Sequence, residues 1–373
     1  MIYLDSAATS LYKPEQVQYA VLDAMNSMSS PGRGAYPSAM RAAACCYDCR
    51  EEIAQLFHMD DPEQVVFTFN ATHALNIAIR SMISPGSSVM ISGYEHNSVT
   101  RTLRALDTKL FIIDTPLFDH IAFLAKAKEL INKVDAVVCT HVSNAFGYIL
   151  PINELSLLCK KNNVPMIIDA SQSAGIIDFN FPATGAAFAA MPGHKGLMGP
   201  QGTGILLCKN DAKPLLYGGS GSESVLQSMP DFLPDRLEAG THNVPGIAGL
   251  LASVRYIQSC GPEELQKKER LLLERLANGI SEIYELNIYF SREPRYQCSV
   301  MSVCPKNMSC EAFSEALASA GISVRAGLHC APLAHKTVGT LDTGTVRFSV
   351  SSFNTNTQIE QTVKICKNIM KNR

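Results

Sequence analysis

The sequence predicts an α/β fold, with a large domain built on a mostly parallel, seven-stranded sheet and a smaller α+β domain at the carboxyl terminus. Three observations lead to this prediction. Short apolar runs alternate with helical patterns between residues 64 and 209, as is typical of a sheet buried on both faces. The chain has 373 residues, more than one small core requires. The alternation loosens after residue 210, which indicates a change of architecture towards the carboxyl terminus.

Composition and charge are those of an ordinary globular protein. The chain is 46% hydrophobic and 18% charged, with a formal net charge of −2, so no electrostatic argument favours nucleic acid or an anionic membrane as a partner. No apolar run approaches the length of a membrane span, and the amino terminus lacks the pattern of a signal peptide. Twelve cysteines without such a signal are typical of reduced thiols in a cytosolic enzyme. We therefore expect a cytoplasmic protein.

The amino-terminal part is predicted to carry two helices. A short apolar strand leads into a turn at residues 5–10, and residues 14–28 have helical spacing. Turn residues at 29–36 separate this helix from a longer one at 38–57. Three cysteines of the longer helix lie in mid-helix rather than where a strand meets a helix, so we interpret them as packing residues and not as a redox or metal motif: Cys45, Cys46 and Cys49.

Seven predicted strands come next, each short and apolar enough to be buried in a sheet. Because helical spacers separate several of them, most should run parallel. In parallel sheets, ligands bind at the edge where the carboxyl ends of the strands meet. The predicted strands are residues 64–69, 88–92, 109–114, 136–141, 164–169, 186–191 and 204–209.

Polar side chains follow these strands at the edge where a ligand would bind. Thr72 opens a helix directly after a strand, and such a residue either caps the helix or joins its free N–H groups in binding a phosphate. Each polar residue alone could be a satisfied loop residue, but their convergence on one edge predicts a ligand site. The convergent residues are Thr72, His96, Asn144, Asp169 with Gln172, and His194 with Lys195.

Asp169 and Lys195 are the most informative of these residues. Asp169 ends a fully apolar strand, so its buried charge needs a partner: the protonated ring nitrogen of a cofactor, or a structural ion pair or helix cap. Lys195 lies among glycines between two apolar strands, where loss of water lowers the pKa of an amine and leaves it free to attack a carbonyl. Taken alone, the same segment would be a glycine-rich surface turn with a solvated lysine.

The smaller domain is expected to combine both ends of the chain. We assign residues 15–250 to the large domain, and residues 1–14 together with 251–373 to the small one. The predicted carboxyl-terminal elements are a helix from Val244, a helix at 263–285 and strands at 287–291, 297–303 and 344–349.

Four short segments of the sequence resemble the class V aminotransferases of fold type I, which use pyridoxal 5′-phosphate. A fifth, residues 325–331, is similar to the segment around the reactive cysteine of SufS-type cysteine desulfurases and selenocysteine lyases. The similarity runs in order from residue 4 to about residue 355. The four segments are Gly193-His194-Lys195, Asp169-Ala170-Ser171-Gln172, His96 after Tyr94-Glu95, and Glu238-Ala239-Gly240-Thr241.

The resemblance implies a cysteine desulfurase and assigns its catalytic groups. Lys195 would form a Schiff base with the cofactor and move protons at the α-carbon of the substrate. His96 would stack on the cofactor ring and assist proton transfer. Cys330 would take the sulfur of L-cysteine, or the selenium of L-selenocysteine, leaving L-alanine and a persulfide on the enzyme. A sulfur-acceptor protein would then be a partner, and no metal is implied.

The resemblance also implies how cofactor and substrate are held. The substrate carboxylate would be bound by Asn144, Arg325 and Arg347, a task that suits the bidentate guanidinium. Thr241 would reach the phosphate bound in the neighbouring subunit of a homodimer. Within one subunit, the cofactor would be held by Thr72, His73, His96, Asp169, Gln172, His194 and Lys195.

Cys330 also has a bottom-up rationale. It follows His329 and lies five residues from Arg325, and nearby positive charge favours the reactive thiolate. The alternative is another packing cysteine. Two departures from the SufS-type pattern leave the substrate preference and the sulfur acceptor open: Pro192 stands where a phosphate-binding serine is usual, and His73 replaces an acidic residue.

Three other functions compete with the desulfurase. A selenocysteine lyase needs the same residues and differs only in its dependence on Cys330. Another class V reaction, such as transamination or epimerisation of a small amino acid, would leave Cys330 incidental. A non-catalytic protein that has kept the fold is the third, but such a protein has no need of Lys195 or Asp169.

Overall fold

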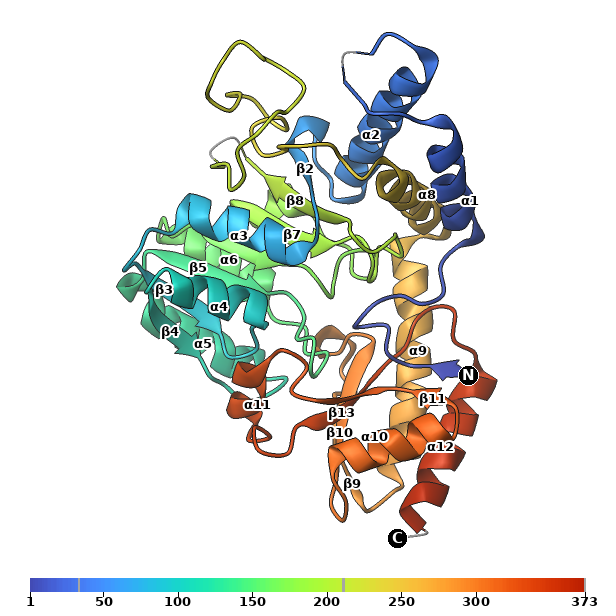
Figure 1. Ribbon diagram of the computed structural model, residues 1–373. Coiled ribbons are helices and arrows are strands. Elements are labelled where there is room, and N and C mark those ends of the chain that lie inside the picture. Colours follow the sequence, from blue (N-terminus) through green and yellow to red (C-terminus); the bar gives the residue numbers. More distant parts are fainter. Residues whose placement is uncertain (33, 210–211, 372–373) are drawn as a thin grey trace.

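A seven-stranded sheet forms the centre of the larger part of the molecule (Figure 1). The computed structural model describes residues 1–32, 34–209 and 212–371. The strand order is β2-β8-β7-β6-β5-β3-β4, and β8 is antiparallel to β2 and β7 while the other four pairs are parallel. All seven predicted strands are therefore confirmed. Their bounds are Val65–Thr68 (β2), Ser88–Ser92 (β3), Lys109–Ile113 (β4), Ala136–Thr140 (β5), Met166–Asp169 (β6), Phe188–Pro192 (β7) and Gly204–Cys208 (β8).

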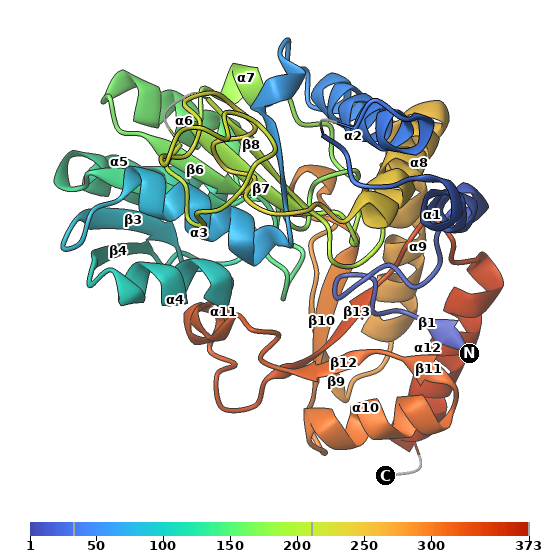
Figure 2. The ribbon, with the colours of Figure 1, turned by 45° about the horizontal axis from the view of Figure 1, so that its top comes forward.

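Helices cover both faces of this sheet (Figure 2). Successive strand residues point to opposite faces. Thus Val137 packs on one face of β5 and Val138 on the other. Because both faces are covered, the strands are apolar throughout rather than alternating. One face is covered by Ala71–Met82 (α3) and Asn97–Ala105 (α4), the other by Pro37–Leu56 (α2), His120–Leu130 (α5), Ile152–Lys161 (α6) and Val244–Cys260 (α8).

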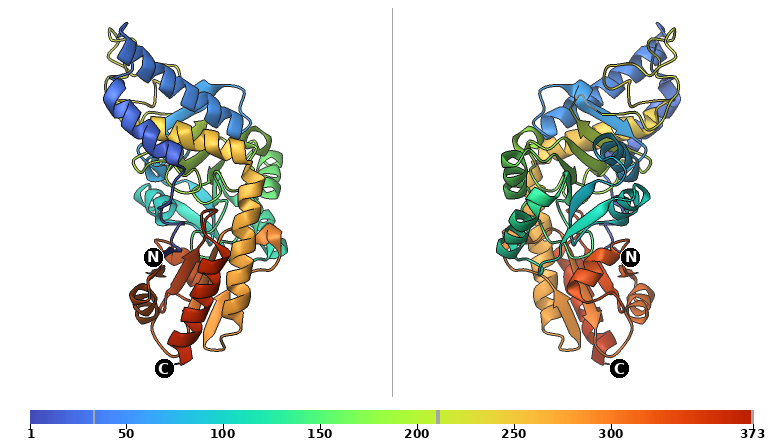
Figure 3. Two further views of the ribbon diagram at one scale, coloured as in Figure 1. Left: turned by 90° about the vertical axis from the view of Figure 1, so that its right-hand side faces the viewer. Right: turned by 90° about the vertical axis from the view of Figure 1, so that its left-hand side faces the viewer.

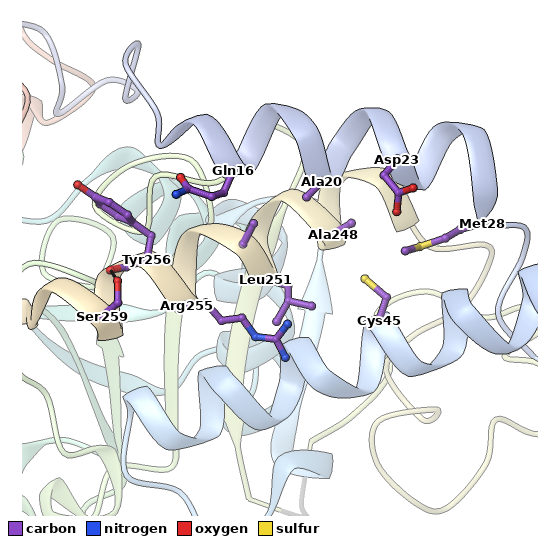
Figure 4. A pocket seen from close by; sticks show the side chains of 11 residues that line it. Gln16, Ala20, Asp23, Met28, Cys45, Ala248, Leu251, Arg255, Tyr256 and Ser259 are labelled. Atoms are coloured by element: carbon purple, nitrogen blue, oxygen red, sulfur yellow. Dashed lines mark hydrogen bonds between the residues drawn. The ribbon is translucent and has the colours of Figure 1, made fainter.

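The two predicted amino-terminal helices are present and pack against α8. Glu15–Ser27 (α1) matches the prediction at 14–28, and α2 matches the one at 38–57. A groove of about 410 Å³ lies between α1, α2 and α8 (Figure 4). Cys45 lines this groove, and the cysteines of α2 are buried among apolar side chains, as packing residues would be.

A second, smaller core includes the carboxyl-terminal half of Pro262–Ser281 (α9), the long helix that leads away from α8 (Figure 3). Leu265 of α9 packs in the larger core and Leu272 in the smaller one, so the change between the two cores lies within this helix. The division of the chain at residues 250 and 251 stays a prediction. None of the described helices is both long and apolar enough to cross a membrane.

The small core is built on an antiparallel sheet with the order β12-β13-β10-β9. Near the amino terminus, Ile2–Tyr3 (β1) pairs in parallel with Ile322–Ser323 (β11), so the start of the chain joins this part of the molecule. The remaining elements are Leu286–Tyr289 (β9), Val300–Pro305 (β10), Cys310–Ser319 (α10), Arg325–Gly327 (β12), Pro332–Val338 (α11), Thr345–Ser349 (β13) and Asn356–Lys371 (α12).

Candidate active site

A cavity of about 120 Å³ lies at the carboxyl ends of β5, β6 and β7, beside the first residues of α3 and α4. Ligands of parallel sheets bind at this edge, outside the carboxyl ends of the strands. The cavity brings together predicted site residues that are far apart in the sequence. They are Thr72, His96, Asn144, Asp169, Gln172, His194 and Lys195.

Lys195 lies in the loop after β7 and is the amine of this cavity. Its side chain is partly exposed to the cavity, but protein atoms surround it closely. The resulting loss of water lowers its pKa to about 8, although the charge of Asp169 acts in the opposite direction. The loop must pass close to its neighbours, because a side chain at position 196 in place of Gly196 would collide with the carbonyl oxygen of Ala174. Roughly one Lys195 side chain in ten is therefore neutral at pH 7, far more than for an ordinary lysine.

Asp169 adds a buried carboxylate to the lining of the same cavity. Its exposed fraction is 2%, and Oδ1 accepts a hydrogen bond of 2.9 Å from the N–H of Ser171. No lysine, arginine or histidine of the described residues forms an ion pair with it. The structural ion pair that the sequence left open is therefore absent from the described part of the chain. A buried carboxylate of this kind fits a cationic group that enters with a ligand.

His96 is held as a neutral ring by Ser98. The N–H of Ser98 donates to Nδ1 at 3.0 Å, so the ring proton lies on Nε2. Ser98 Oγ lies 2.9 Å from the same Nδ1 and 2.7 Å from Thr72 Oγ1, which links His96 to the start of α3. Burial lowers the pKa of His96. The ring can therefore donate a hydrogen bond from Nε2 towards a ligand.

The start of α3 provides an anion site. Asn70 caps the helix by accepting from the N–H of His73 at 2.9 Å, which leaves the N–H groups of Ala71 and Thr72 without partners among the described residues. Such free N–H groups and the positive end of the helix dipole suit a phosphate. His194 lies at the same cavity, where burial and then Lys195 lower its pKa to about 4. It is therefore a neutral hydrogen-bonding partner rather than a cation.

Two of the predicted cofactor residues lie outside this cavity. His73 stacks on Phe69 with ring centroids 4.7 Å apart and accepts from the N–H of Phe69 at Nδ1. It lines a separate cavity of about 40 Å³, together with Thr241. The physical reason is helix geometry, since neighbouring residues point about 100° apart around the axis. His73 therefore does not line the cavity that holds Thr72 and Lys195.

Both predicted substrate arginines converge on Asp5, a residue that the sequence analysis treated only as part of a turn. Arg347 donates from Nη2 to Asp5 Oδ1 at 2.9 Å and from Nη1 to the carbonyl oxygen of Asn144 at 3.0 Å. Arg325 donates from Nη2 to Asp5 Oδ2 at 2.8 Å. The sequence signal that could have found Asp5 is an acidic residue directly after a short apolar strand, ahead of small residues.

The turn at residues 5–10 joins the parts of the site to one another. Gln172 donates to the carbonyl oxygen of Ala7 at 3.0 Å, which ties the turn to the end of β6. The N–H of Ser10 donates to the carbonyl oxygen of His194 at 2.9 Å, and the N–H of Ala7 donates to Ser349 Oγ at 2.9 Å. The amino terminus is thus built into the wall between the lysine loop and β13.

Cys330 is exposed and lies in the short loop between β12 and α11. His329 and Cys330 both adopt left-handed backbone conformations, with φ values of 50° and 56°, which non-glycine residues rarely do. The loop is held from the large domain, because Asn144 Nδ2 donates to the carbonyl oxygen of His329 at 2.7 Å and the N–H of Asn97 donates to that of Cys330 at 2.8 Å. Cys330 is close enough to raise the pKa of Lys195 electrostatically.

The expected source of positive charge beside Cys330 needs a correction. His329 is buried, and this lowers its pKa to about 2, so the ring is neutral. Its Nε2 lies 3.1 Å from Thr345 Oγ1. Burial by distant segments is not visible in the sequence, so His329 was expected to carry a positive charge. The cationic groups within electrostatic range of Cys330 are Arg325 and Lys195, and Cys330 acts to raise the pKa of each.

These features define the chemistry that the site can perform. The cavity combines free N–H groups suited to an anion, a buried carboxylate suited to a cation, and an amine of lowered pKa. A guanidinium pair suits a carboxylate, and an exposed thiol lies near the amine. The arrangement fits a charged cofactor together with a small amino acid.

The known proteins that this chain resembles include cysteine desulfurases. The family model described as Aminotransferase class-V matches residues 2–362. A probable cysteine desulfurase of Methanothermobacter thermautotrophicus is 32% identical, with 96% of this chain and 92% of that protein covered. A cysteine desulfurase of Haloferax volcanii is 29% identical, with 97% of this chain and 88% of that protein covered.

The fold itself is matched by solved structures. The apo structure of cysteine desulfurase from Thermococcus onnurineus NA1 has a TM-score of 0.90 and 29% identity, and the match covers 100% of this chain and 95% of that one. The cysteine desulfurase CsdA of Escherichia coli has a TM-score of 0.84 at 23% identity, and the match covers 99% of this chain and 94% of that one. At this low identity the match supports only the fold. The α/β fold class that the sequence predicts is therefore confirmed.

Proposed function

The chain belongs to the class-V aminotransferase family, and from that premise we propose that it is a pyridoxal-phosphate-dependent cysteine desulfurase. The reaction converts L-cysteine and the thiol of Cys330 into L-alanine and a persulfide on Cys330. The bond between the β-carbon and the sulfur of the substrate breaks, and a sulfur–sulfur bond forms with Cys330. A proton then takes the place of sulfur on the β-carbon, which becomes the methyl group of alanine. One observation carries the proposal: an exposed thiol lies within electrostatic reach of an amine whose pKa is lowered to about 8.

The residues of the cavity fit pyridoxal 5′-phosphate. Asp169 is a buried carboxylate that forms no direct ion pair among the described residues, and a protonated ring nitrogen would give it one. The free N–H groups of Ala71 and Thr72 suit its phosphate. Lys195 would hold its aldehyde carbon, and Gln172 and His194 would complete the wall. When bound, the cofactor supplies an electron sink for the α-carbon of the amino acid.

Residues of this chain transfer the proton, bind the substrate and attack its sulfur. Lys195 accepts and returns a proton at the α-carbon, since it is poised between its charged and neutral forms at neutral pH. His96 donates a hydrogen bond from Nε2, because Ser98 occupies its Nδ1. Arg347 and Asn144 hold the carboxylate of the substrate, and Cys330 attacks its sulfur. Asn97 and Asn144 keep the Cys330 loop against the site.

The first experiment measures L-alanine and persulfide formation from L-cysteine by the protein loaded with pyridoxal phosphate. We expect a visible absorption band that Lys195→Ala abolishes. We also expect alanine formation that Cys330→Ser reduces by about a hundredfold or more. Equal alanine formation by the wild type and Cys330→Ser would favour a different class V reaction. Loss with L-cysteine but not with L-selenocysteine in Cys330→Ser would be compatible with either a desulfurase or a selenocysteine lyase, and relative wild-type rates would then decide.

We further propose that the enzyme is a homodimer that passes sulfur to an acceptor protein. Phe69, which is 57% exposed, lines the same cavity as Thr241, and Tyr217, which is 76% exposed, follows Leu216 of that cavity in the chain. A second copy of the chain would cover these apolar side chains. Thr241 lies beside them, where it would reach the cofactor phosphate of the partner. Sedimentation of the wild type at twice the monomer mass, and of a Tyr217→Ser variant at a lower mass, is the expected result. Cys330 is exposed, so an acceptor thiol can reach it.

A further inference from the structure

Asp5 accepts ionic hydrogen bonds from both arginines that the resemblance assigns to the substrate carboxylate. Its side chain is only 10% exposed. One oxygen, Oδ2, accepts from Arg325 at Nε (3.1 Å) and Nη2 (2.8 Å), and the other, Oδ1, accepts from Arg347 Nη2 at 2.9 Å. A single carboxylate therefore fixes two guanidinium groups.

The two arginines differ in what else they contact. Arg347 is 3% exposed at its side chain, while Arg325 is 52% exposed. Arg347 also donates to the carbonyl oxygen of Asn144, and its Nε is buried without a hydrogen-bond partner among the described residues. An unpaired, buried guanidinium N–H is costly unless a ligand accepts from it. Among the described residues, the hydrogen bonds of the Arg325 guanidinium all go to Asp5.

We propose that Asp5 is a positioning residue for the substrate carboxylate, acting through Arg347. It holds Nη2 of Arg347 while Asn144 holds Nη1, so the orientation of the planar guanidinium is fixed and its Nε–H is left for the substrate. Arg325 clamps Asp5 from the solvent side. Arg325 therefore acts on Asp5 instead of contacting the substrate, which changes the role that the sequence resemblance gave it.

The charges of this cluster leave room for one carboxylate. Two guanidinium groups and one carboxylate leave one positive charge. The cluster therefore accepts one carboxylate, and Asp5 repels a second acidic group. This inference rests on the proposed function and concerns how the single carboxylate of its amino-acid substrate is held.

The test is Asp5→Asn, which keeps the size of the side chain and removes its charge. Without the ionic bonds, the guanidinium of Arg347 loses its fixed orientation, so we expect the KM for L-cysteine to rise about tenfold or more, while kcat changes little. Cysteamine, which has the amine and thiol of cysteine but no carboxylate, is the matched control substrate. Its kcat/KM should be the same in the wild type and Asp5→Asn, which a merely structural loss would not allow.

Three results would overturn the proposal. An unchanged KM for L-cysteine would leave Asp5 as a counter-ion only. A lowered KM would mean that Asp5 competes with the substrate carboxylate. Equal losses for L-cysteine and cysteamine would indicate general damage to the fold. Arg325→Gln is the second variant, and we expect it to raise the KM for L-cysteine by a smaller factor, because Asp5 keeps its bond to Arg347.

A binding measurement separates this proposal from the proposed function. Calorimetric titration of the loaded protein with L-alanine does not depend on turnover, and Asp5→Asn should weaken that binding about tenfold. If the wild type forms no alanine from L-cysteine, the desulfurase proposal fails while this titration still tests Asp5. If the wild type is active and L-alanine binds both proteins equally, only the inference on Asp5 fails.

Discussion

Burial sets the charge of most titratable groups around the cavity. It lowers the pKa of His194 to about 4 and that of His329 to about 2, so both rings are neutral at physiological pH. It lowers the pKa of Lys195 to about 8 against the charge of Asp169. Arg325 and Arg347 keep their positive charge at physiological pH, and Lys195 is charged in roughly nine molecules in ten at pH 7. Charge at the site is therefore concentrated where an anionic substrate group binds.

The lowered pKa of Lys195 predicts the pH dependence of cofactor attachment. A neutral amine is the reactive form, and with a pKa of about 8 roughly one molecule in ten is neutral at pH 7. The rate at which apo-protein captures pyridoxal phosphate should rise with pH and reach half its maximum near pH 8, measured by the appearance of visible absorption. Asp169 raises the pKa of Lys195, so Asp169→Asn should move the midpoint to lower pH. A wild-type midpoint above pH 10 would contradict this account.

Short elements, rather than long ones, place the reactive groups. Lys195 lies in the loop after β7, and Cys330 lies in the loop between β12 and α11. Each is held by hydrogen bonds from residues far away in the sequence, as the turn at residues 5–10 is. The positions of these loops therefore depend on the two parts of the molecule being docked together.

Asn144 is predicted to hold the Cys330 loop in place. Its Nδ2 donates to the carbonyl oxygen of His329 at 2.7 Å, in a loop where two residues are in the left-handed region. Asn144→Ala should therefore raise amide hydrogen exchange across residues 328–331 and speed alkylation of Cys330 by iodoacetamide several-fold. Asn162→Ala is the control, because within the described part of the chain the side chain of Asn162 bonds to Leu158 of the helix that it follows and to no other segment. Identical exchange in the wild type and Asn144→Ala would show that Asn97 alone holds the loop.

At the scale of the whole molecule, a buried ionic cluster joins α2, β2 and the segment before α8. Glu238 accepts from Arg50 at 2.6 Å and pairs with His242 at 2.8 Å. The N–H of Phe67 also donates to Glu238. Although burial acts to raise the pKa of Glu238, Arg50 and His242 outweigh it and lower the pKa. This cluster fixes the segment that carries Thr241.

Glu238→Gln should destabilise the protein by about 3 kcal/mol or more, since it leaves the buried Arg50 unpaired. Because the pKa of Glu238 is lowered on folding, its ionic contribution is complete above the unfolded value of about 4.3 and is lost as the pH falls through the folded value. Urea unfolding at neutral pH measures the first effect. A series of acidic pH values should show a smaller loss of stability in the variant than in the wild type. Equal urea midpoints at neutral pH would contradict the prediction.

The sequence by itself determined the elements and the composition of the site. Strands buried on both faces are apolar throughout, and helices have a different period, so all seven strands of the large sheet and the two amino-terminal helices could be predicted. Parallel strands also present their carboxyl ends at one edge. For that reason the residues after β2, β5, β6 and β7 could be placed in one cavity before any coordinates were known.

Only the tertiary structure decided the partners and the charges. Asp5 and Arg347 are separated by 342 residues, and no local pattern indicates that they meet. The neutral state of His329 depends on burial by other segments, and the direction of His73 depends on its angle around the helix axis. Periodicity is a local property of the chain, whereas an ion pair or a pKa depends on every segment packed nearby. The fold class could therefore be read from the sequence, while the role of Asp5 required the structure.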